Sequence, residues 1–303
     1  MVHRVVHCGT GNIGAAALRA ILQHPDLELV GHFVSTPAKA ARDSGEVVGV
    51  TPAGVTTTND WADVIDLGAD CVTYFANSIG REREAIADLV PFLERGTNVV
   101  TFSGFEIAHP ASAPPELREP IEAACRAGGS SCYFTGIDPG WATTDLAIAS
   151  LAAANRVDCI RVLELGWWGD YTAEFVCREY FGFGKEPGFQ PLLVTGGFIE
   201  KMWAPTLHQL AEVLGGEVEE FRVVYETTVS TTTSKPASAR WPRAPHPSFT
   251  LSCRRFRPAG RSRSSSTWTA LRAMWDGSGS SRSVRRTCPT ESRSKAIRAS
   301  PSR

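Results

Sequence analysis

The sequence predicts an α/β protein in which a doubly wound parallel sheet is followed by a smaller α+β domain. Over residues 1–135, short β-branched or aromatic runs alternate with amphipathic helical segments, and over residues 136–233 this alternation becomes less regular. Buried strands that alternate with helices form parallel sheets covered on both faces, through right-handed crossovers. A basic, serine-rich composition sets residues 234–303 apart from both.

Five strands and three helices are expected within residues 1–135. The strands are expected at residues 2–8, 27–34, 70–76, 97–102 and 131–136. Each helix has apolar residues at helical spacing and a proline or glycine at an end, which are common boundary signals. The helices are expected at residues 12–24, 81–96 and 114–129.

Residues 136–233 are expected to form a smaller and incomplete α+β layer that binds substrate and contributes to dimerisation. Helices are expected at residues 143–155, 173–183 and 197–216, and strands at residues 159–168 and 219–233. The last strand is long and would present unpaired N–H and C=O groups, so it needs partner strands.

The composition argues against several classes of protein. The eight cysteines are scattered, without CxxC pairs or histidines at metal-ligand spacing, so we expect neither a disulfide framework nor a metal site. No apolar run reaches the roughly 18 to 20 residues of a membrane span. We expect no leader peptide before the first strand. We therefore expect a cytoplasmic protein that has no membrane partner.

The tail, residues 234–303, has a composition of its own. It holds 14 Arg and 2 Lys against 2 acidic residues, whereas the preceding residues carry a net charge of −15. It also holds 16 Ser and only 6 Val, Ile, Leu and Phe, so on its own it is expected to be disordered. Either it is a basic arm that binds nucleic acid, or the reading frame shifts near codon 234. The abrupt change inside a domain favours the frameshift.

A glycine turn follows the first strand. The motif G-x-G-x-x-G comprises Gly9, Thr10, Gly11, Asn12, Ile13 and Gly14. In Rossmann-type folds the first glycine permits the tight turn, the second lets the backbone approach a pyrophosphate, and the third lets the helix pack closely. The helix N-terminus then offers N–H groups and a positive dipole. We interpret the motif as a dinucleotide site; the alternative is a purely structural turn.

The end of the second strand indicates which dinucleotide is bound. An acid here would hold the ribose 2′-OH of NAD, but Ser35 and Thr36 occupy its place, and Lys39 and Arg42 follow. Hydroxyls and cations suit a 2′-phosphate, so NADP is favoured over NAD. The alternative is that Lys39 and Arg42 form a solvated helix face.

Five motifs together resemble a known family. They are GTGNIG at 9–14, DSGEVVG at 43–49, GTNVVTFSGFE at 96–106, TGIDPGW at 135–141 and YFGFGKEP at 180–187. In this order they resemble the dihydrodipicolinate reductase-like oxidoreductases. The closer resemblance is to the branch that holds 2,4-diaminopentanoate dehydrogenase and the native amine dehydrogenases. It extends to about residue 233 and implies a homodimer.

The resemblance implies roles for further residues. Those expected beside the cofactor are Ala76, Asn77 and Ser78. The residues expected in the turn into the substrate domain are Asp138, Pro139, Gly140 and Trp141, and Trp141 would wall the pocket. Glu106 matches the catalytic carboxylate of the family, and it also follows a predicted strand at the sheet edge where α/β proteins bind ligands. A carboxylate there could shuttle protons and stabilise a cationic iminium. The alternative is a loop carboxylate that faces water.

The second domain contains an aromatic cluster in which Trp168 and Tyr171 are expected to wall a pocket for a small, weakly charged substrate. A core or dimer interface is the alternative.

The resulting hypothesis is an NAD(P)-dependent oxidoreductase that catalyses reductive amination of a small ketone or aldehyde, or the reverse deamination of an amine. A cofactor-sensing protein without catalysis is one alternative. A 4-hydroxy-tetrahydrodipicolinate reductase is another, disfavoured because the His-His-x-x-Lys and Ser-Gly-Thr motifs of that enzyme have no counterpart. A nucleic-acid binder acting through its tail is the third.

Overall fold

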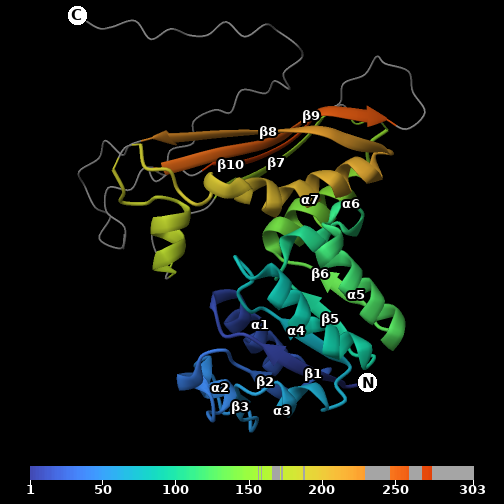
Figure 1. Cartoon of the computed structure of the whole chain (residues 1–303), viewed down its shortest axis with the longest axis vertical. Coiled ribbons are helices and arrows are strands. Elements are labelled where there is room, and N and C mark those ends of the chain that lie inside the picture. The colour runs from blue at the N-terminus through green and yellow to red at the C-terminus, as the bar shows by residue number, and fades with distance from the viewer. Residues whose placement is uncertain are drawn as a thin grey trace, which may run out of the picture.

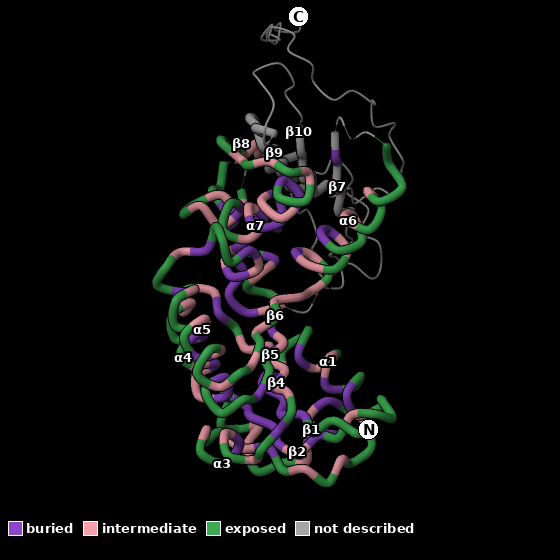
Figure 2. Tube along the Cα trace, turned by 90° about the vertical axis from the view of Figure 1, so that its right-hand side faces the viewer, coloured by how far each residue is buried: buried purple, intermediate pink, exposed green. Residues whose placement is uncertain are grey.

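The computed structural model describes residues 1–155, 157, 159–165, 171, 173–186, 188–228, 246–258 and 268–274. The chain forms two sheets, each with its own hydrophobic core (Figures 1 and 2). We call the part built on the six-stranded sheet the first domain, and the part built on the four-stranded sheet the second domain.

The first domain confirms the predicted doubly wound parallel sheet. Its six strands are all parallel and lie in the order β3-β2-β1-β4-β5-β6. Their bounds are β1 His3–Cys8, β2 Leu27–Phe33, β3 Thr57–Thr58, β4 Cys71–Tyr74, β5 Asn98–Thr101 and β6 Cys132–Phe134. The chain order reverses beside β1, and ligands of such sheets bind beyond the carboxyl ends of the strands at this point.

Helices cover both faces of this sheet. They are α1 Asn12–Gln23, α2 Ser44–Val47, α3 Ala62–Ile65, α4 Glu82–Glu94 and α5 Pro115–Gly128, with short 3-10 turns η1 Pro37–Lys39, η2 Phe105–Ala108 and η3 Pro110–Ser112. Successive residues of β1 point to opposite faces. Val5 therefore packs in the core beneath α1, while Val6 packs in the core beneath α4 and α5.

The second domain is a mixed sheet with helices on the side of the first domain. Its strands lie in the order β7-β10-β9-β8, with bounds β7 Cys159–Leu165, β8 Gly216–Thr228, β9 His246–Pro258 and β10 Trp268–Met274. The helical elements are η4 Ile137–Asp145, α6 Leu146–Leu151, η5 Val176–Tyr180, η6 Thr195–Gly197 and α7 Phe198–Val213. Only β10 and β7 run parallel, and the β8–β9 and β9–β10 pairs are antiparallel.

Two strands come from the tail, for which the sequence predicts no ordered structure. β9 pairs with β8 so that Phe249, Leu251 and Cys253 lie opposite Tyr225, Val223 and Phe221. Apolar residues alternate there with polar ones, a pattern typical of a strand. The long β8, which needs a partner, thus finds one in the tail. Average composition hides this local alternation. The rest of the tail lies outside the described residues.

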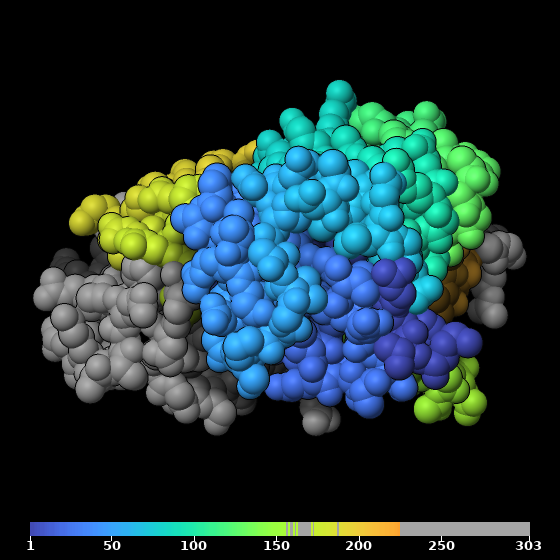
Figure 3. Space-filling model, turned by 90° about the horizontal axis from the view of Figure 1, so that it is seen from below, coloured from blue at the N-terminus to red at the C-terminus, as the bar shows by residue number. Residues whose placement is uncertain are grey.

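Helix α7 joins the two domains. Trp203 and Leu207 of this helix are buried in the second core, against Phe221 of β8. The helix also contacts η2 of the first domain and η4. Figure 3 views the molecule from the first-domain end, where residues coloured blue to teal form most of the described surface. Within the described ranges, no helix is long and apolar enough to cross a membrane.

Candidate active site

A cleft of about 630 Å³ lies between the two domains. On the first-domain side it is lined by the loops that follow β1, β2, β4 and β5, and on the other side by η5 and α7. The cleft brings together these predicted site residues: Gly9, Thr10, Gly11, Asn12, Ile13, Ser35, Thr36, Lys39, Ala76, Asn77, Ser78, Asp138 and Tyr171.

The three glycines of the turn meet different surroundings. Gly9 has a φ of +108°, and a Cβ there would lie 2.8 Å from the carbonyl carbon and oxygen of Phe75. A Cβ on Gly14 would lie 2.5 Å from the Gly9 carbonyl oxygen. In contrast, a Cβ on Gly11 would meet no atom within 4 Å, and Gly11 lines the cleft. Gly9 and Gly14 are therefore needed for packing, while Gly11 leaves open space for a ligand.

The glycine turn rests on a buried histidine. His7 Nε2 donates to the Gly9 carbonyl oxygen at 2.7 Å, and its Nδ1 lies 2.8 Å from the Thr73 hydroxyl. The ring of His32 is 5.3 Å away. Burial lowers the pKa of His7 to about 4 and that of His32 to about 3, so both rings are neutral at neutral pH. A neutral, doubly hydrogen-bonded ring fixes the turn without adding charge.

Lys39 reaches across to the glycine turn. Its Nζ donates to the Thr10 hydroxyl at 2.9 Å and to the Thr10 carbonyl oxygen at 3.3 Å. Ser35 and Thr36 line the same end of the cleft, whereas the exposed Arg42 does not. The two basic residues therefore differ: Lys39 belongs to the cleft, and Arg42 fits the solvated-face interpretation.

Hydrogen bonds tie together the loops after β4 and β5. The Gly104 N–H donates to Ser78 Oγ at 3.0 Å, and the Ser103 hydroxyl donates to the Ala76 carbonyl oxygen. Arg81 donates to the Asn77 carbonyl oxygen at 3.0 Å. These contacts hold residues 76–78 at the cleft wall.

Glu106 lies in η2, directly after Phe105, which lines the cleft. The Glu106 side chain is half-buried and is not itself among the cleft-lining residues. Its Oε2 is buried and has no hydrogen-bond partner among the described residues. Burial raises the pKa of Glu106, the nearby Glu82 raises it further, and Lys201 opposes the rise.

The second-domain end of the cleft is largely apolar. Its lining includes Phe102, Phe105, Val176, Tyr180, Phe181, Leu193, Phe198, Met202 and Trp203. The Tyr180 ring packs edge-on against Phe198, with ring centroids 4.9 Å apart. Among the described residues at this end, the charged one is Asp138, whose two carboxylate oxygens accept from Trp203 Nε1 at 3.0 and 3.1 Å.

Several predicted residues do not line this cleft. Trp141 is 56% exposed. The chain turns just before it, where Gly140 has a φ of +140° and the Trp141 N–H donates to the Gly136 carbonyl oxygen. Pro139 is buried, and Gly140 lines a different cavity. Trp168 lies outside the described residues.

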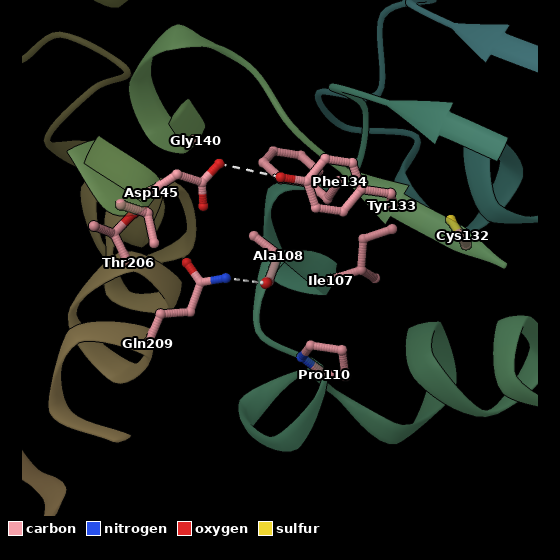
Figure 4. A pocket seen from close by; sticks show the side chains of 11 residues that line it. Ile107, Ala108, Pro110, Cys132, Tyr133, Phe134, Gly140, Asp145, Thr206 and Gln209 are labelled. Atoms are coloured by element: carbon pink, nitrogen blue, oxygen red, sulfur yellow. Dashed lines mark hydrogen bonds between the residues drawn. The ribbon is translucent and has the colours of Figure 1, made fainter. Parts of the chain in front are cut away.

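That second cavity, of about 140 Å³, lies where α7 meets η2 and β6 (Figure 4). Gln209 donates to the Ala108 carbonyl oxygen at 2.7 Å, and the Tyr133 hydroxyl donates to Asp145 at 3.1 Å. These bonds join the first domain to the segment that leads into the second.

Some site residues give weak signals in the sequence. Phe198 and Met202 lie one helical turn apart on α7, a spacing that equally predicts core packing. His7 occupies a buried strand position, where its contact with Gly9 depends on the turn. The Asp138–Trp203 pair joins residues 65 positions apart, so no local pattern indicates it.

Fold and site together define a two-domain, Rossmann-type α/β protein whose glycine turn opens onto an interdomain cleft. Residues 3–90 match the family described as dihydrodipicolinate reductase, N-terminus. The chain is 32% identical over 231 residues to an amine dehydrogenase of Streptomyces virginiae, covering 74% of this chain and 64% of that protein. The chain thus spans less than two thirds of that relative.

Further comparisons give one shorter sequence match and two matches of fold. A segment of 63 residues is 38% identical to the 4-hydroxy-tetrahydrodipicolinate reductase of Synechocystis sp., covering 21% of this chain and 23% of that protein. The structure of an amine dehydrogenase from Mycobacterium smegmatis superposes with a TM-score of 0.69 at 18% identity, covering 92% of this chain and 80% of that chain. An oxidoreductase from Sinorhizobium meliloti gives a TM-score of 0.50 at 16% identity, covering 92% and 67%. The sequence matches thus confirm a resemblance to dihydrodipicolinate reductase-like oxidoreductases and to an amine dehydrogenase, and the two structural matches show the shared fold alone.

Proposed function

We propose that this chain is an NAD(P)-dependent oxidoreductase that acts on a C–N or C=N bond, by reductive amination of a small ketone or aldehyde or by the reverse deamination. One observation carries the proposal: a glycine turn suited to a dinucleotide and an apolar pocket with an acidic group share a single cleft. The similarity to an amine dehydrogenase supports the reaction class.

The first-domain end of the cleft fits a nicotinamide dinucleotide. A Cβ at Gly11 meets nothing within 4 Å, so backbone and ligand can approach each other. Helix α1 begins beside it with neither a side-chain cap nor an acidic residue in its first turn, which favours a pyrophosphate there. Lys39 at the rim supports NADP over NAD, because its ammonium group can pair with a 2′-phosphate. When bound, the nicotinamide supplies or accepts the hydride.

The charges in the cleft favour a substrate without a carboxylate. Among the described lining residues, Lys39 is the one cation, and it lies at the dinucleotide end. A dicarboxylate at the apolar end would be buried without a counter-charge, which is costly. We therefore favour a simple ketone, aldehyde or amine over the substrate of a 4-hydroxy-tetrahydrodipicolinate reductase.

Glu106 is the proposed proton carrier. The raised pKa places it closer to neutral pH than an ordinary carboxyl, where a group that both gives and takes protons is most effective. Glu106 does not line the cleft, so its Oε2, without a partner among the described residues, would exchange a proton with the substrate through a water molecule.

Mixing the full-length protein with NADPH, ammonium and a panel of small ketones and aldehydes tests the proposal. The expected result is loss of the absorbance of reduced nicotinamide that requires all three components. Tight NADPH binding without turnover of any carbonyl would instead support a cofactor-sensing protein. Loss of absorbance with a cyclic dicarboxylate imine alone would support a dihydrodipicolinate reductase activity.

A further inference from the structure

Among the described residues, one anionic group lines the apolar end of the cleft. Among the described residues that line the cleft, Asp138 and Lys39 are the two that carry charge, and they lie at opposite ends. Lys39 is engaged with Thr10 at the dinucleotide end. Asp138 follows β6 and accepts from Trp203 of α7, and it lines the same cleft as the aromatic and aliphatic side chains.

Asp138 is held in place by a buried indole. Trp203 is 4% exposed and packs in the core of the second domain, so its Nε1–H has a fixed position. This one N–H is shared between the two carboxylate oxygens, at 3.0 and 3.1 Å. A carboxylate has about four lone-pair sites. Most of the acceptor capacity of Asp138 is therefore not used by the described residues, so a ligand in the cleft can bind to it.

The charge of Asp138 is not balanced by the described part of the protein. The ion pairs among described residues involve other acids, such as Asp88 with Arg81 and Glu179 with Lys185. A carboxylate in a partly apolar cleft is costly when unpaired, and a cationic ligand offsets this cost. A neutral carbonyl compound cannot do so, because it carries no positive charge and no N–H or O–H donor.

We propose that Asp138, oriented by Trp203, binds the protonated amino group of the amine substrate or the ammonium ion at the apolar end of the cleft. The inference rests on the proposed C–N chemistry and deepens it, because it names the residue that selects a cationic nitrogen. Asp138 is thus a binding residue, and Glu106, outside the lining, keeps the separate task of carrying protons.

Binding to the NADP⁺ complex tests the inference without turnover. The probes are cyclohexylammonium and cyclohexanol, which share a ring and differ in charge, titrated calorimetrically at neutral pH. We expect the wild-type complex to bind the ammonium at least tenfold more tightly than the alcohol. Asp138→Asn keeps an oxygen acceptor for Trp203, so it should retain the fold and the alcohol affinity while losing this preference.

Two further variants sharpen the test. Asp145→Asn removes an acid of the same segment that bonds to Tyr133 at the second cavity, and it should leave the preference intact. Trp203→Phe removes the N–H but keeps an aromatic ring, and it should reduce the preference less than Asp138→Asn does.

The outcomes separate this inference from the proposed function. Normal NADP⁺ binding with no ammonium preference in the wild type, or an equal loss in Asp145→Asn, would overturn the role of Asp138 and leave the cofactor site standing. Absence of NADP⁺ binding would overturn the proposed function, and the inference with it.

Discussion

Two alanine substitutions in the glycine turn provide the sharpest test of the cofactor site. Gly9→Ala should lower the stability of the fold, whereas Gly11→Ala should lower the affinity for NADPH. In Gly9→Ala, the new Cβ would lie 2.8 Å from the Phe75 carbonyl group, and φ would remain at +108°. A side chain at such a φ costs about 1–3 kcal/mol, and overpacking against backbone costs about 1–3 kcal/mol more. We expect the free energy of unfolding to fall by about 2–6 kcal/mol.

Gly11→Ala is the matched variant. The φ of Gly11 is −72°, which alanine readily adopts, and no atom lies within 4 Å of the new Cβ. The free energy of unfolding should therefore change by less than about 1 kcal/mol. The methyl group would stand where the pyrophosphate approaches the backbone, so NADPH affinity should fall at least about tenfold, or ~1.4 kcal/mol.

Urea unfolding followed by circular dichroism measures the first quantity, and calorimetric NADPH titration measures the second. A Gly9→Ala protein as stable as the wild type would refute the packing argument. A Gly11→Ala protein that binds NADPH with wild-type affinity would refute the placement of the pyrophosphate.

Three other predictions concern charge. Lys39→Ala should weaken NADPH binding about five- to tenfold and leave NADH binding unchanged, while Arg42→Ala should affect neither; equal losses for both coenzymes would contradict the 2′-phosphate contact. Because the folded-state pKa values of His7 and His32 are lowered to about 4 and 3, the unfolded chain takes up protons first as the pH falls below about 6.5. Urea unfolding should therefore show stability decreasing from pH 6.5 towards pH 4 by a few kcal/mol, and a His7→Gln, His32→Gln protein should show a flatter dependence. Glu106→Gln should lower kcat by about 100-fold or more at unchanged NADPH affinity. The wild-type rate should also change with pH above the ordinary carboxyl range, as Glu106 titrates, and the variant should lose this change. A variant that keeps it would show that another group titrates there.

The first domain could be predicted from the sequence because its signals are local and agree with each other. Val5 and Val6 in one short strand serve two different cores, as expected of a strand covered on both faces. The spacing of Gly9, Gly11 and Gly14 places the turn between this strand and its helix. The two-residue β3, Thr57–Thr58, and the four-residue helices α2 and α3 are too short to give a pattern, and the sequence did not predict them.

The site was harder to predict because its geometry depends on long-range packing. Asp138 was expected near the substrate, but its bond to Trp203 follows from the way α7 packs against the first domain. Trp141 was expected to wall the pocket, and the turn at Gly140 directs it elsewhere. Similarly, the strands at 246–258 and 268–274 depend on the free edges of β8 and β7, which the composition of the tail does not reveal.

Calorimetric titration of the full-length protein with NADPH and NADH tests most directly whether the interdomain cleft holds a nicotinamide dinucleotide. The expected result is one site per chain, with NADPH bound more tightly than NADH. No measurable affinity for either coenzyme would contradict the cofactor site and the oxidoreductase function built on it.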